Sequence, residues 1–381
     1  PRTFPYVAGI LRALDKLASN RWWSLGTVVA LASVLLILGV GSVGYWEPHE
    51  VSVLTSLERH DQKQDKSETT ARDETPKAKQ NARNDKKLES HPDPKHAERN
   101  PCPGPTPPPA MTARLGAAGQ SLLGNGELGA RLPLAIVGVL VFVLTWFMGR
   151  LFAGPRAGLL AAAIALTFPA LLFGSRQLTG DMATTLAATL TMTCAVLLLW
   201  PPKGTHLAYS VLAAVGAAAG LYIGYESSGL LLGVAAPAGA VAAAGLVFAI
   251  GAIGDYRRSG NLPGQHVRVG GITAIFAVVA LAAIVLFIRT VFDWTPAGTE
   301  DRQLFGHTLA PCLGATKAAM GSWRLDGNPE VTFNALIEQV AFGAFPWVVL
   351  APIAVGRLGF ATTLDRRTLI GYLVFSWAAL T

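Results

Sequence analysis

The sequence predicts an all-α polytopic membrane protein, and three observations indicate this fold class. About half (51%) of the 381 residues are hydrophobic, only 14% are charged, and apolar runs long enough to cross a bilayer recur between short polar loops. Of the 55 charged residues, 21 fall between Glu58 and Arg99. The net charge of +7 does not indicate nucleic-acid binding, because the other arginines are scattered among apolar runs and form no basic helix.

Nine apolar runs are candidate membrane spans. Each except the last is near the ~20 residues that a straight or tilted spanning helix needs. They lie near residues 25–45, 131–149, 158–174, 182–200, 207–223, 229–253, 271–292, 334–355 and 368–381. The last run stops short at Thr381, and the chain begins at Pro1 rather than at methionine. We therefore expect the sequence to be a fragment of a longer protein.

Lysine and arginine in the short loops predict the orientation, because these residues favour the cytoplasmic side. With all nine runs counted as spans, one side carries Arg2, Arg12, Lys16, Arg21, Arg150, Arg156, Lys203, Arg257, Arg258, Arg268, Arg357, Arg366 and Arg367. The other side has only Arg176 in a short loop. We therefore expect a cytoplasmic N-terminus. Carboxylates from distant parts of the chain, such as Asp181 and Glu226, then share the non-cytoplasmic surface.

A polar insert divides the chain into three parts. Residues 58–100 carry eleven positive and ten negative charges, and "NPCPGPTPPPA" follows them. Such a segment buries too little apolar surface to offset the entropy of ordering it, so 58–110 is expected to be a disordered external insert. Residues 1–57 hold the cytoplasmic N-terminus, the first span and the start of the external loop. Residues 111–381 form the multi-span domain, with about eight further helices.

Two acids follow the first span in "GYWEPHEVSVL". Acids at the exit of a membrane helix can simply mark the water boundary. However, Trp46 is suited to the headgroup level, Pro48 fixes the backbone, and Glu50 opens a short amphipathic helix expected to lie at the interface. This pattern makes Glu47 and Glu50 candidate functional residues.

A second candidate pair lies in the external turn "SRQLTGD". Asp181 could be an ordinary helix N-cap, favoured by the helix dipole, and Arg176 an ordinary interface residue. Their position on the same predicted surface as Glu50 favours a functional reading, in which the arginine binds phosphate and the acid takes part in chemistry.

The order of these features resembles a known family. An acid follows the first span, then come a long external loop, a Pro-Pro stretch before "GELGARLP", and "GRLFAGPRAGLLAAAIALTFPALLFGSRQLTGDM". This pattern is similar to the integral-membrane GT-C glycosyltransferases, the group of lipid A aminoarabinose transferase and the protein O-mannosyltransferases. Residues 127–200 carry the strongest likeness, and "ALIEQVAFGAFPW" at 335–347 adds to it. The resemblance implies a GT-C-like helical bundle with external interfacial helices.

The resemblance also implies a reaction. A polyprenyl-phosphate sugar would donate its sugar to an acceptor (lipid A, protein or another glycan) on the periplasmic face of a bacterial-type plasma membrane. A carboxylate would act as general base. By position this base is Glu50, with Asp181 and Glu47 as further catalytic candidates. Donor phosphate would contact Arg176, and then Arg324 and Lys317. The partners implied are the donor lipid, the acceptor and membrane lipids, without nucleic acid, and no cofactor is implied, although a divalent metal stays open.

This sequence departs from the family pattern at three places. The Asp-Glu dipeptide expected after the first span is His49-Glu50 here. The basic residue expected before Pro-Pro is absent from "TPPPA". A lysine common after the fifth span is absent from "GYESSG", which carries Glu226 instead. Donor-phosphate contacts are therefore expected to come partly from other residues.

The sequence also leaves alternatives for the function, for a metal site and for a disulfide. A transporter or flippase is the main alternative, although the acids cluster at one surface and no inverted repeat is visible. A membrane scaffold is the third. His49 and His307 are external but lack metal-ligand spacing. Cys102 and Cys312 could pair in an oxidising compartment or stay as free thiols. Stretches such as "GAAAG" and "GLLLGV" are predicted to be helix-packing surfaces.

Overall fold

The computed structural model describes residues 16–37, 110–124, 126–176, 181–200, 207–259 and 264–293, with short pieces within 303–308 and 343–373. The helices are α2 (Arg21–Ile37), α6 (Ala110–Leu123), α7 (Glu127–Ala153), α8 (Pro155–Leu166), α9 (Pro169–Gly174), α10 (Asp181–Leu199), α11 (Leu207–Leu230), the π-helix η1 (Leu231–Ala235), α12 (Ala236–Ser259), α13 (Gly264–Asp293) and the 3₁₀-helix η3 (Trp347–Leu350). Strands β1 (Gln303–Leu304) and β2 (His307–Thr308) pair antiparallel. Apart from that hairpin the described elements are helical, which confirms the predicted fold class.

Four helical stretches among the described residues are long and apolar enough to cross a membrane. They are Glu127–Leu151, Met182–Leu199, Leu207–Ile250 and Val267–Arg289. The third has 44 residues. If straight, it would measure roughly 66 Å, about twice the hydrocarbon core of a bilayer. It is instead two helices joined at a kink, where Gly229 has a φ of +76°. This agrees with the two separate runs predicted at 207–223 and 229–253.

The predicted span at 158–174 is interrupted in the structure. Helix α8 ends at Leu166, and α9 begins at Pro169. Proline has no backbone N–H and disfavours helical backbone in the residue before it. Phe168 accordingly has an extended conformation, with φ −75° and ψ 116°. The break therefore follows directly from the sequence.

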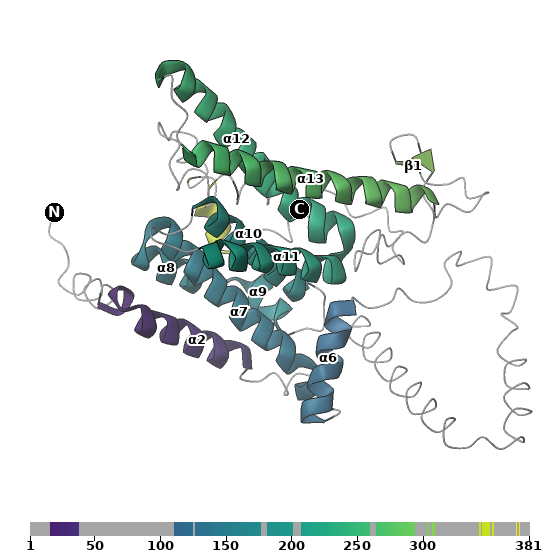
Figure 1. Cartoon of the computed structure of the whole chain (residues 1–381). Helices are drawn as coiled ribbons and strands as arrows, with labels where there is room; N and C mark the ends of the chain where they lie inside the picture. The colour runs from purple at the N-terminus through teal and green to yellow at the C-terminus, as the bar shows by residue number, and fades with distance from the viewer. Residues whose placement is uncertain are drawn as a thin grey trace, which may run out of the picture.

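The helices lie in successive layers (Figure 1). Helix α2 packs on α7 and α8, α10 joins α7 to α11, and α12 and α13 pack together on the far side of α10 and α11. One apolar core gathers residues of α2, α7 and α8. The larger one gathers residues of α10, α11, α12 and α13. On α2 the buried positions recur every fourth residue, from Ser24 to Leu36, so a single face of this helix meets its neighbours.

Glycines allow several of these close contacts, which confirms the prediction for the glycine-rich stretches. A Cβ at Gly216 of "GAAAG" would lie 2.6 Å from the Cys194 sulfur, and one at Gly220 would lie 3.0 Å from the Thr191 backbone nitrogen. Small residues therefore let α11 approach α10 closely, as they do in many membrane helix pairs.

Candidate active site

Polar contacts join the helix ends in two separate groups. The Arg150 guanidinium donates to the Ala18 carbonyl at 3.2 Å, and Arg268 donates to the Ser210 hydroxyl at 3.0 Å. Both contacts join helix ends that the charge pattern places on the cytoplasmic side. The contacts described next join ends that it places on the opposite side. These contacts group the helix ends as the alternation of basic and non-basic loops predicts. Which of the two groups faces the cytoplasm stays a prediction.

Arg176 lies where α2 and α9 end. Its Nη2 donates a hydrogen bond to the Leu35 carbonyl, which comes from the last turn of α2. Ser175 beside it is fully buried, and a Cβ at Gly138 of α7 would lie 2.9 Å from the Ser175 Cβ. Arg176 therefore helps to join α2 to α9. Its predicted role as a phosphate ligand is not tested by this contact.

Asp181 is the first residue of α10, so it begins a helix as expected. Its side chain lies outside the described part of the structure. One turn later, the Thr184 hydroxyl shares a hydrogen bond with the Ser228 hydroxyl near the end of α11. The beginning of α10 and the end of α11 are thereby held together at the predicted external surface.

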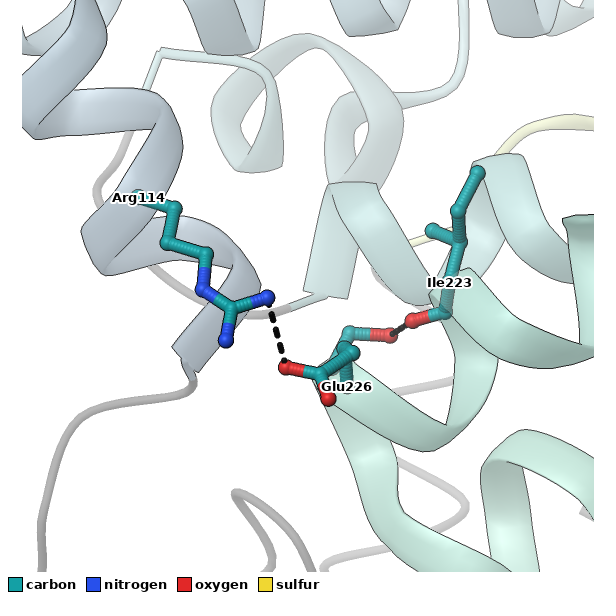
Figure 2. Close-up of polar contacts among 4 residues, drawn as sticks. Arg114, Ile223 and Glu226 are labelled. Carbon is teal, nitrogen blue, oxygen red and sulfur yellow. Dashed lines mark hydrogen bonds and ion pairs between the residues drawn. The ribbon is translucent and has the colours of Figure 1, made fainter.

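The kink between α11 and α12 contains a buried acid. The Glu226 side chain is only 7% exposed, and its Oε2 lies 3.2 Å from Nη1 of Arg114 on α6 (Figure 2). The neighbouring Ser227 hydroxyl donates to the Ile223 carbonyl at 2.8 Å. The Arg114 side chain is 62% exposed. This ion pair therefore connects a solvated cation on α6 to a carboxylate enclosed by the bundle.

The backbone at the kink explains how Glu226 is held. Gly229 has a positive φ, and the π-helix η1 follows at once. A Cβ at Gly224 would lie 3.0 Å from the Gly233 Cα, so the two segments touch through their backbones. Wide π-helical turns inside longer helices recur at functional sites.

A buried cation, Arg131, lies near the beginning of α7. Arg131 is 3% exposed as a residue, and its Nη1 lies 3.8 Å from Oε2 of Glu127 one turn earlier. Sequence reasoning did not single out Arg131 or Arg114. The i,i+4 pair within "GELGARLP" was a visible signal for Arg131. No local signal indicated that Arg114 meets Glu226, because 112 residues separate them.

Several predicted site residues lie outside the described residues, namely Glu47, Glu50, Lys317, Arg324, His49, Cys102 and Cys312. The same holds for the side chain of His307. Cys194 is a buried free thiol within α10. In the part of the chain that the structure describes, no three His, Cys, Asp or Glu side chains gather in a way that could hold a metal ion. The predicted residues that the structure brings to one end of the bundle are Arg176 and Asp181.

Comparison with known proteins agrees with the resemblance. Residues 107–250 match the family model described as dolichyl-phosphate-mannose-protein mannosyltransferase. Among solved structures, the chain is similar to "Crystal Structure of ArnT from Cupriavidus metallidurans in the apo state", at 18% identity and a TM-score of 0.37. That match covers 71% of this chain and 48% of the other, so the chain spans about half the length of that structure. No curated protein matches the chain.

Proposed function

We propose that this chain is a glycosyltransferase that transfers a sugar from a polyprenyl-phosphate donor to an acceptor at the non-cytoplasmic membrane face. The match of residues 107–250 to the dolichyl-phosphate-mannose-protein mannosyltransferase family supports this proposal. The observation that carries the proposal is that the segment matched by the family model also contains the polar helix ends. The matched segment contains most of the helices from α6 to α12, and their predicted external ends hold Arg176, Asp181 and the Arg114–Glu226 pair. Cationic and acidic groups are thus present where a lipid-linked phosphate would meet the bundle.

The proposed reaction is inversion at the anomeric carbon of the donor sugar. An acceptor hydroxyl oxygen forms the new bond, and the bond between that carbon and the phosphate oxygen breaks. Glu50 takes the hydroxyl proton as general base, with Asp181 and Glu47 as further candidates. Polyprenyl phosphate leaves. Positive charge stabilises the leaving phosphate, and arginine suits this task because it offers paired N–H donors.

In this proposal Arg176 is the first ligand of the donor phosphate, with Arg324 and Lys317 as the next candidates. The acceptor is lipid A, a protein or another glycan. The active site faces the periplasm, and the N-terminus lies in the cytoplasm. The grouping of helix ends supports a single polar surface of this kind, because Arg176 and Asp181 come from helix ends that the charge pattern places together.

The experiment is transfer of a labelled sugar from polyprenyl phosphate in membranes that contain each variant. Glu50→Gln keeps the size of the side chain but removes the proton acceptor, so turnover should fall by roughly 10²- to 10⁴-fold while donor binding persists. Glu47→Gln should be milder. Arg176→Ala should weaken donor binding, since it removes a charged phosphate partner.

Two outcomes would contradict the proposal at different levels. Full activity of Glu50→Gln together with an inactive Glu47→Gln would move the base to the other carboxylate. Movement of lipid-linked sugar across the membrane by the wild-type chain, with no transfer to any acceptor, would favour the flippase instead.

A further inference from the structure

We propose that Arg114 binds the phosphate of the lipid-linked donor and that the buried Glu226 carboxylate positions it. This inference rests on the proposed function, which supplies the phosphate-bearing ligand. Arg114 takes a binding role and Glu226 a positioning role, because only Arg114 is exposed enough to reach a ligand.

The first argument is the asymmetry of the ion pair. The Glu226 side chain is 7% exposed and the Arg114 side chain 62%. A carboxylate removed from water needs a partner, so Glu226 holds one end of the guanidinium by its Nη1 at 3.2 Å. The other donors of a guanidinium form a planar fork that fits phosphate oxygens. A fixed arginine with a solvated outer edge is suited to bind an anion.

The second argument is the position of the pair at the end of the spans. Helix α6 packs on α7 and on α11, next to the first residue of the apolar stretch Glu127–Leu151. Glu226 sits just before the kink at Gly229. In the predicted topology the pair therefore lies at the non-cytoplasmic ends of the spans, which is the level expected for a lipid phosphate.

The third argument is the distribution of buried and exposed residues on α6. Thr112, Gly116 and Gly119 are buried on one face, whereas Leu122 and Leu123 at its end are 83% and 51% exposed. A helix with one face on the protein and exposed leucines at its end is suited to lie at the interface. Arg114 projects from the same helix toward Glu226 in Figure 2.

A comparison with Arg176 strengthens the assignment. One amino group of Arg176 already donates to a backbone carbonyl that joins α2 to α9. Arg114 instead pairs with the buried Glu226 carboxylate, and its side chain stays 62% exposed. The two arginines come from different elements at the same predicted surface.

The rival explanation is that the pair only joins α6 to α11. Exchanging the charges separates the two roles. The double variant Arg114→Glu with Glu226→Arg restores an ion pair between the helices but places a carboxylate at the exposed position. A purely structural pair predicts recovery of both thermal stability and lipid binding. A binding role predicts recovery of stability alone.

The experiment uses the full chain in lipid nanodiscs, with sugar-free polyprenyl phosphate as the probe and the uncharged polyprenol as its control. Arg114→Gln should weaken binding of polyprenyl phosphate by about tenfold to a hundredfold, the range for a hydrogen-bonded charged group. Arg114→Lys should fall in between, and polyprenol binding should not change. Arg268→Gln is the matched control, since this exposed arginine lies at the opposite end of the bundle.

If the exchanged pair does not fold, the neutral pair Arg114→Gln with Glu226→Gln keeps a hydrogen bond and removes both charges. It should retain stability and lose phosphate binding. Wild-type binding in Arg114→Gln, or recovered binding in the exchanged pair, would overturn the role of Arg114 while leaving the proposed function intact. Failure of the wild-type chain itself to distinguish polyprenyl phosphate from polyprenol would overturn the proposed function as well.

Discussion

The contact between α6 and α7 allows a direct test, because α6 carries Arg114. A Cβ added at Gly119 would lie 2.6 Å from Cγ of Pro133 and closer still to the Gly129 carbonyl oxygen. Ordinary contact begins at 3.4 Å. Gly119→Ala must therefore move α6 away from α7 by at least about 0.8 Å, since neither the proline ring nor the backbone can rotate away.

The displacement has two expected consequences. Overpacking of this kind costs about 1–3 kcal/mol of stability. If the shift falls along the ion pair, the N–O separation between Arg114 and Glu226 grows from 3.2 Å to about 4.0 Å, which weakens the pair. Donor binding should then fall along with thermal stability, even though Gly119 itself contacts no ligand.

The matched control is Gly270→Ala in α13, where an added Cβ meets nothing within 4 Å. Alanine is favoured over glycine in a helix by roughly 1 kcal/mol at both positions, so the difference between the variants isolates the packing cost. The assay is thermal unfolding of each purified variant in the same detergent. Equal midpoints for Gly119→Ala and Gly270→Ala would refute the close packing of α6 and the reasoning built on it.

Three further predictions concern the parts of the chain around the bundle. A topology reporter fused after Asp255 should be cytoplasmic, and one fused within 60–100 should be external; an internal insert would overturn the site assignment. Deleting 62–98 should leave membrane insertion intact and transfer activity at least partly preserved, because this stretch has no apolar anchors; complete loss of activity in a stably inserted variant would show a role beyond linking. Cys102 and Cys312 should appear as one cross-linked peptide in a non-reducing digest, and two free thiols there would dismiss the pairing.

The glycosyltransferase resemblance could be identified from sequence because its signals are local. The stretch "GELGARLP" through "SRQLTGDM" is continuous, and the family match over residues 107–250 includes it. Arg176 was singled out from local sequence as well, because it stands alone in a short loop opposite the basic side; its role as a phosphate ligand stays a prediction. The catalytic assignment of Glu50 remains a prediction, because that residue lies outside the described part of the structure.

The sequence by itself determined the helical class and the two apolar runs that meet at the kink, because hydrophobic run length acts over a few residues. The run at 158–174 was expected as one span, and the break before Pro169 was recognised only in the structure, although proline chemistry explains it. Only the tertiary structure decided that Arg114 meets Glu226. The sequence placed Glu226 on the predicted non-cytoplasmic surface, but it gave no partner for this acid and did not single out Arg114. Packing of α6 across α7 and α11 brings them together, and the Arg114 guanidinium provides a cation for the buried Glu226 carboxylate from a distant part of the chain.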